Sequence, residues 1–166
     1  MRRKSVVAII GGSTCTPEQA NLARDVGRLL AEHDCMVVCG GRTGVMKAVC
    51  EGAWSAGGFT IGILRGSKEH PENPYLSLVI PTNMGGARNA LIVQTGQVVI
   101  AIGGSFGTLS EIGHAVRQGR EVIGLDTWEL DPPAGEDDPI RHVDCAEDAV
   151  ALALRVLRED ETSRSE

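Results

Sequence analysis

Short apolar runs alternate along this sequence with segments that carry apolar residues at helical spacing. Strands are predicted at residues 6–10, 36–39, 59–64, 78–80, 98–102 and 121–125, with a short edge strand at 141–143. Most of these runs are apolar throughout, which is typical of parallel strands buried on both faces. Because helical segments separate most of them, the pattern predicts an α/β fold: a single doubly wound, Rossmann-like domain with a mostly parallel sheet of six to seven strands and helices on both faces.

Helix start signals mark several of the segments between the strands. Thr16, Pro17 and Gln19 are of the types favoured at the N-cap, N1 and N3 positions of a helix. Residues 84–95 are predicted to form one helix, although two glycines weaken its start. Asp144 is the expected cap of the last helix.

The chain shows no internal repeat and no linker, so we expect one domain over residues 1–166. Its core is expected at residues 4–157, followed by a frayed C-terminal tail of about eight residues.

Composition excludes several classes of function. The net charge of −6 gives no broad basic surface for nucleic acid, and no apolar stretch approaches the roughly 18 residues of a membrane span. Five cysteines without a C-x-x-C pattern indicate reduced thiols of a cytoplasmic protein. Cys35 and Cys39 could share one face of a strand, but two ligands do not make a zinc site, and no metal is expected.

Glycine accounts for 21 of the 166 residues, against a usual share of about 7%. Four clusters lie near predicted strand-to-helix turns: Gly11 and Gly12; Gly40, Gly41 and Gly44; Gly85 and Gly86; and Gly103, Gly104 and Gly107. In a parallel sheet these turns meet at the carboxyl ends of the strands, where ligands of doubly wound folds bind. We therefore expect a ligand site there, with Gly11, Gly12 and Ser13 in the phosphate- or nucleotide-binding set.

The strongest local signal is the turn from Gly103 to Thr108, which leaves an apolar strand and enters a helix. Its glycines permit close backbone approach, and the helix N-terminus offers free N–H groups to a phosphate. The expected phosphate-binding residues are Gly103, Gly104, Ser105, Phe106, Gly107 and Thr108. Glu111 follows three residues later and has two interpretations: a site residue, or the acidic partner in a capping box with Thr108.

Two further turns carry candidate residues. Gly40, Gly41, Gly44, Val45 and Met46 form either a second nucleotide-binding turn or a tight contact between a small-residue helix and the sheet.

Asn83 and Met84 precede Arg88, which is predicted to lie early in a helix. A cation there opposes the helix dipole, so its partner is either a bound anion or a surface acid.

Together these segments resemble the LOG-like superfamily, whose signature is P-G-G-x-G-T-x-x-E. Residues 103–111 read G-G-S-F-G-T-L-S-E, with one extra residue and with Ile102 in place of the proline. Residues 40–46 resemble the family's G-G-x-x-G-x-M, and Arg88 falls at its upstream arginine. The Ala-Arg-Asn pattern at 87–89 is closer to the branch that contains molybdenum cofactor carrier proteins and related bacterial proteins.

The resemblance implies a nucleotide-binding protein. The main function that it implies is that of a phosphoribohydrolase. Such an enzyme cleaves the N-glycosidic bond of a nucleoside 5'-monophosphate to give free base and ribose 5-phosphate, with Arg88 and Glu111 as catalytic residues and without a required cofactor. The alternative is a non-catalytic carrier of molybdenum cofactor or a similar phosphorylated cofactor. The ligand would be an AMP-like nucleotide or a pterin phosphate, and the family implies a homodimer or homotetramer.

Overall fold

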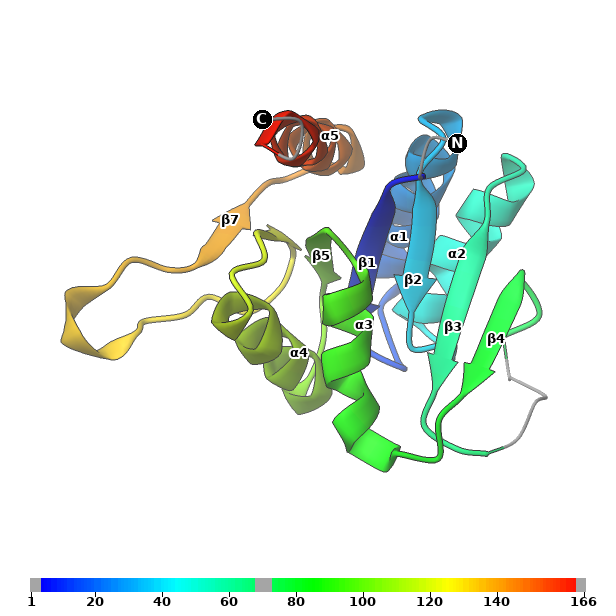
Figure 1. Cartoon of the computed structure of the whole chain (residues 1–166), viewed down its shortest axis with the longest axis horizontal. Coiled ribbons are helices and arrows are strands. Elements are labelled where there is room, and N and C mark those ends of the chain that lie inside the picture. Colours follow the sequence, from blue (N-terminus) through cyan, green and yellow to red (C-terminus); the bar gives the residue numbers. More distant parts are fainter. Residues whose placement is uncertain (1–3, 68–72, 164–166) are drawn as a thin grey trace.

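A computed structural model describes residues 4–67 and 73–163, and within them seven strands form one sheet (Figure 1). Every pairing is parallel, in the order β4-β3-β2-β1-β5-β6-β7. The strands are β1 (Val6–Gly11), β2 (Met36–Cys39), β3 (Thr60–Leu64), β4 (Leu78–Pro81), β5 (Val98–Ile102), β6 (Val122–Leu125) and β7 (Ile140–His142). The predicted strands therefore exist, each within one residue of its expected bounds.

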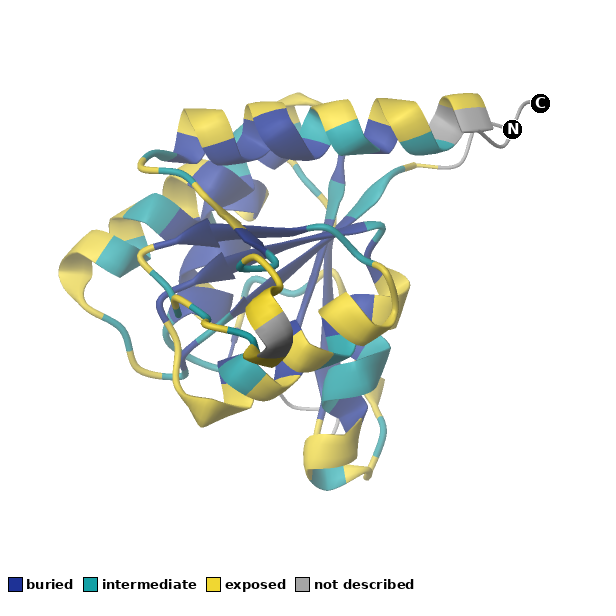
Figure 2. Ribbon diagram, turned by 90° about the vertical axis from the view of Figure 1, so that its left-hand side faces the viewer, coloured by how far each residue is buried: buried dark blue, intermediate teal, exposed yellow. Residues whose placement is uncertain are grey.

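Helices cover both faces of the sheet, which confirms the doubly wound α/β prediction. The helices are α1 (Pro17–Glu32), α2 (Val45–Ser55), α3 (Asn89–Thr95), α4 (Phe106–Arg117) and α5 (Ala146–Ser163), with 3-10 helices η1 (Gly85–Arg88) and η2 (Pro133–Gly135). Residues of β1 alternate between two apolar cores: Val7 packs with α1, α2 and α5, whereas Ala8 packs with α3 and α4. Figure 2 shows the central strands buried between these layers. No helix among the described residues is long and apolar enough to span a membrane.

The sheet order creates a switch point beside β1. The chain builds outward from β1 through β2, β3 and β4, then returns to place β5 on the other side of β1. Gly11 pairs with Ile102 at the ends of these neighbouring strands. The turns that follow β1 and β5 therefore begin side by side and diverge, which is where such sheets bind ligands.

The predicted start of α1 is confirmed. The Thr16 hydroxyl accepts a hydrogen bond from the Gln19 N–H, and the Gln19 side chain accepts one from the Thr16 N–H. This capping box leaves the Gln19 amide nitrogen free to donate to Asp126 beyond β6, at 2.8 Å. The cap of α1 is thereby tied to the carboxyl end of the sheet.

Two helix predictions are wrong in detail. Residues 84–95 do not form one helix, because Gly85 adopts a positive φ of 57° and the chain enters α3 through η1. The last helix begins at Ala146, so Cys145 rather than Asp144 stands directly before it. It continues to Ser163, the last residue that the structure describes, and the expected fraying of the tail stays a prediction.

Candidate functional site

A small cavity of about 80 Å³ lies at the carboxyl ends of the strands. It is lined by residues from five separate segments: Gly11, Gly12 and Ser13 at the end of β1; Arg42 and Met46 between β2 and the first turn of α2; Arg65 after β3; Arg88 and Asn89 at the start of α3; and Ser105, Gly107, Thr108 and Glu111 around the start of α4. The structure thus brings together the predicted candidates Arg88 and Glu111 with residues from three of the four glycine-rich turns.

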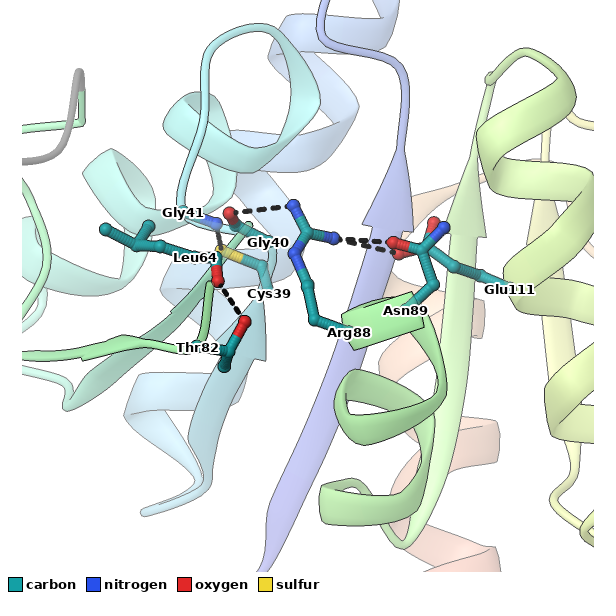
Figure 3. A network of polar contacts seen from close by, with 8 residues as sticks. All are labelled: Cys39, Gly40, Gly41, Leu64, Thr82, Arg88, Asn89 and Glu111. Carbon is teal, nitrogen blue, oxygen red and sulfur yellow. Dashed lines mark hydrogen bonds and ion pairs between the residues drawn. The ribbon is translucent and has the colours of Figure 1, made fainter. Parts of the chain in front are cut away.

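Arg88 is the most enclosed charged residue of the cavity, with 3% of its surface exposed. Its Nη2 donates to the Gly40 carbonyl at 3.2 Å and its Nη1 to the Asn89 amide oxygen at 2.7 Å (Figure 3). Its Nε is buried and has no hydrogen-bond partner. The surface salt bridge considered for Arg88 is therefore wrong, and one buried donor stays unsatisfied, which is rare in folded proteins.

Glu111 points toward Arg88 from α4, with its Oε1 3.8 Å from Arg88 Nη1. It does not cap the helix, because α4 begins at Phe106 with Ser105 as its N-cap, and Glu111 lies in the second turn. Burial raises the pKa of Glu111 to about 8, and Arg88 offsets only part of that rise. The carboxyl group is therefore mostly protonated at pH 7.

Two arginines that the sequence interpretation did not single out, Arg42 and Arg65, line the same cavity. Burial lowers the pKa of Arg88; Glu111 opposes this effect, and Arg65 and Arg42 add to it. Guanidinium groups nevertheless keep their charge in proteins. Three cations beside one largely neutral carboxyl group make the cavity positive, although the whole chain carries −6.

The sequence positions of Arg42 and Arg65 could have indicated that both arginines lie near the site. Arg65 directly follows the last residue of β3, and Arg42 stands inside the glycine-rich turn after β2. Asn89 belongs to the Ala-Arg-Asn pattern but was not predicted as a site residue. It lines the cavity and accepts a hydrogen bond from Arg88.

The turn after β5 presents the start of α4 to the cavity. Gly103 and Gly104 have positive φ values of 54° and 114°. A Cβ on Gly104 would lie 2.5 Å from Thr108. Ser105 makes no side-chain capping bond, so its hydroxyl does not occupy the first-turn N–H groups. These N–H groups and the helix dipole favour an anion at this end of the cavity.

Gly40 allows the close approach of Arg88 to the turn after β2. A Cβ at this position would lie 2.7 Å from Arg88 Nη2 and 2.8 Å from Met46 Sδ. Gly40 thus supports the site from behind, without lining the cavity itself.

Gly44 and Val45 serve packing between turns. Gly44 has a φ of 63°, and a Cβ there would lie 2.3 Å from the Gly12 carbonyl oxygen, which accepts a hydrogen bond from the Val45 N–H. Val45 is fully buried in the core. Other predicted binding residues also lie outside the cavity lining: Gly41, Asn83, Met84, Gly103, Gly104 and Phe106.

Comparison with known proteins gives the family context of this site. A sequence model of the SLOG cluster4 family matches residues 4–152. An uncharacterised protein of Archaeoglobus fulgidus is 39% identical over 119 residues, which cover 72% of this chain and 78% of that protein.

Solved structures with high similarity include two that are described by the cofactor they bind or carry. The molybdenum cofactor binding protein of Rippkaea orientalis is 30% identical with a TM-score of 0.85, over 95% of this chain and 99% of that one. The molybdenum cofactor carrier protein of Chlamydomonas reinhardtii is 27% identical with a TM-score of 0.82, over 94% and 99% of the two chains. DNA processing protein A of Streptococcus pneumoniae shares the fold at 20% identity and a TM-score of 0.69, over 89% and 61%. The expected lack of nucleic-acid binding therefore stays a prediction.

Proposed function

The chain belongs to the SLOG cluster4 family, and we propose that it is a carrier that binds molybdenum cofactor, or a similar phosphorylated pterin, through the phosphate group. One observation carries the proposal: Arg88 Nε is buried beside the cavity without a partner. A buried donor without an acceptor is costly. A phosphate oxygen in the cavity would remove that cost.

The charges around the cavity suit a phosphate dianion. Arg42 and Arg65 supply two further guanidinium groups, and the first turn of α4 adds N–H donors. An ionised Glu111 would repel the dianion, but its raised pKa leaves a neutral carboxyl group that can donate a hydrogen bond. A phosphate can therefore bind without an ionised Glu111 beside it.

The size of the cavity indicates how a ligand would lie. Its volume of about 80 Å³ is far below the roughly 300–1,000 Å³ of pockets that enclose a whole drug-sized ligand. The phosphate would occupy the cavity, and the rest of the ligand would lie at its mouth. A carrier that later delivers its ligand benefits from such partial exposure.

A second candidate function is phosphoribohydrolase activity, which the pairing of Glu111 with Arg88 favours. Arg88 would hold the phosphate or ribose, and Glu111 would orient or deprotonate the water that attacks C1' of the ribose. With a pKa of about 8, Glu111 is a base in only a minor fraction of molecules at pH 7. The rate of a reaction that uses this base would rise with pH up to about 8.

The deciding experiment loads purified protein with molybdenum cofactor and separates it from free cofactor by gel filtration. We expect molybdenum and pterin to co-elute with the protein, and Arg88→Gln to abolish this co-elution. Arg28→Gln is the matched control, because Arg28 makes surface ion pairs on α1 away from the cavity.

A parallel incubation with AMP and GMP tests the second candidate by the release of free base. Release that disappears in Glu111→Ala, without any retention of cofactor, would overturn the carrier proposal in favour of the hydrolase. Retention of cofactor by both wild type and Glu111→Ala, without base release, would exclude the hydrolase.

We also propose a homodimer or larger assembly built on the β4 side of the sheet. Leu78 and Ile80 of this edge strand are 45% and 40% exposed, although they pair in register with the buried Ile61 and Ile63. On this face α3 packs against β1 and β2, and no helix lies in front of β4 in Figure 1. A second copy would cover this apolar edge, because bare edge strands are prone to association.

A further inference from the structure

Two of the five aromatic residues of this chain stand together beside the cavity. Phe106, the first residue of α4, is 79% exposed, the highest value among the large apolar side chains of the described residues. Its ring lies 5.6 Å from that of Trp128, at an angle of 45°. Trp128 follows β6 and is half-buried. Phe106 is thus held by one aromatic contact and buries little of its own surface.

The residues after β6 are attached to the turn that carries Phe106. Trp128 Nε1 donates to the Ser105 carbonyl at 3.2 Å, and the Thr127 hydroxyl donates to the Gly103 carbonyl at 2.6 Å. The Gly103 N–H in turn donates to the Leu125 carbonyl at 3.1 Å. These bonds tie the segment after β6 to the turn before Phe106, and Trp128 also packs against the core on the α3 and α4 face of the sheet. Trp128 therefore supports the exposed Phe106 ring from one side.

The aromatic pair adjoins the proposed phosphate position. Ser105 and Gly107, the two chain neighbours of Phe106, both line the cavity, whereas Phe106 itself does not. A Cβ built on Gly107 would meet no atom within 4 Å, so space beside the first turn of α4 is open. Arg88 lines the same cavity, and its nine-tenths-buried side chain has an unpartnered Nε. A ligand that is anchored there by phosphate and extends over the first turn of α4 would reach this ring.

We propose that Phe106 and Trp128 form a stacking platform for the fused heterocycle of the bound ligand, and that this platform selects ring-bearing phosphates over simple sugar phosphates. The inference rests on the proposed binding function and adds the ligand class that the site prefers. Exposed aromatic faces gain free energy when a planar ring stacks on them. The platform also accounts for a large apolar side chain that the protein leaves in water between two residues, Ser105 and Gly107, that line a polar cavity.

The test compares GMP with ribose 5-phosphate, because guanine contains the aminopyrimidinone ring of a pterin and ribose 5-phosphate has no base. Trp54→Phe makes Trp128 the sole tryptophan, since the chain has two, and leaves an aromatic ring beside Tyr75. We expect GMP to quench Trp128 fluorescence and ribose 5-phosphate to bind without quenching. Calorimetry in the otherwise unchanged protein should show tighter binding of GMP.

Removal of the ring should affect only the ring-bearing ligand. Phe106→Ala should weaken GMP binding about tenfold, in line with the measured effect of losing one stacked ring, and leave ribose 5-phosphate within about twofold. Phe106→Leu, which keeps apolar bulk, should weaken GMP nearly as much. Val116→Ala removes another exposed apolar side chain from α4 and should change neither ligand.

The outcomes separate the platform from the site on which it depends. Equal affinity of wild type for GMP and ribose 5-phosphate, or an equal loss for both in Phe106→Ala, would overturn the platform and leave the phosphate site intact. Failure of both phosphates to bind would overturn the phosphate site, and the platform with it. Phe106 is mostly exposed, so both variants are expected to fold, which their thermal unfolding checks.

Discussion

Arg88 Nη1 and Glu111 Oε1 lie 3.8 Å apart, and only 4% and 9% of the two side chains are exposed. Burial works against charge on both groups: it lowers the pKa of Arg88 and raises the pKa of Glu111 to about 8. At neutral pH the pair is therefore mainly a guanidinium beside a carboxylic acid. The positive charge is left available to an anion, instead of being cancelled within the pair.

Replacing Arg88 with lysine should weaken phosphate binding while keeping the charge. One ammonium group cannot reproduce the planar guanidinium that bonds to Gly40 and Asn89 and keeps a further N–H donor at Nε. We expect the affinity for ribose 5-phosphate, measured by calorimetry, to fall at least about tenfold. Arg28→Lys on α1 should bind like wild type, and an Arg88→Lys protein of undiminished affinity would contradict the assigned role.

The stability difference between wild type and Glu111→Gln should depend on pH. The folded pKa of Glu111, about 8, lies above its ordinary value of 4.5, so between these values the folded state holds more protons than the unfolded state. Wild-type stability therefore falls as pH rises through this window, and Glu111→Gln lacks that contribution. The free energy of unfolding, measured with urea at pH 6 and at pH 9, should therefore rise for Glu111→Gln relative to wild type between the two pH values, by up to a few kcal/mol. A difference that is constant with pH would contradict a buried neutral carboxyl group.

The strands and the α1 cap could be predicted because their signals are local. A continuous apolar run such as that of β5 has few interpretations, and Thr16 with Gln19 satisfies a capping box within four residues. The spacing of Thr108 and Glu111 matches the same motif, but of the two interpretations that it left open for Glu111, the structure excludes the cap. Positive φ values at Gly103 and Gly104 turn the chain early, so that α4 starts at Phe106 and Glu111 faces the cavity.

The composition of the cavity could be predicted only in part, because it depends on the order of the strands. Arg42 follows β2 and Arg65 follows β3, and they share a cavity with Arg88 only because β3, β2 and β1 are consecutive strands of the sheet. The contact of Phe106 with Trp128 joins α4 to the segment after β6. No spacing rule within either segment indicates that contact.

Gly107→Ala should stabilise the ligand-free protein and weaken phosphate binding. A Cβ at this position in α4 would meet nothing within 4 Å, and alanine is favoured over glycine in a helix by about 0.5–1 kcal/mol. Because Gly107 lines the cavity, the same Cβ would reduce the space at the proposed phosphate position. We expect a melting temperature a few degrees higher and a lower affinity for ribose 5-phosphate.

Gly113→Ala is the matched control for this change. Gly113 is also in α4 and also has open space around its Cβ position, but it lies outside the cavity. It should raise the melting temperature by a similar amount and leave the affinity for ribose 5-phosphate unchanged. If both variants bind like wild type, a phosphate does not approach the first turn of α4.

Ile80→Lys should dissociate the proposed assembly. Ile80 lies on the exposed edge strand β4, in register with buried Ile63 of β3, and a lysine on an edge strand disfavours association. Sedimentation velocity should give a dimer or larger species for wild type and a monomer for Ile80→Lys. Val116→Lys places the same charge at an exposed apolar position of α4 and should sediment like wild type. A single mass shared by all three proteins would show that this edge is not the interface, because the charge at Ile80 would then meet no partner.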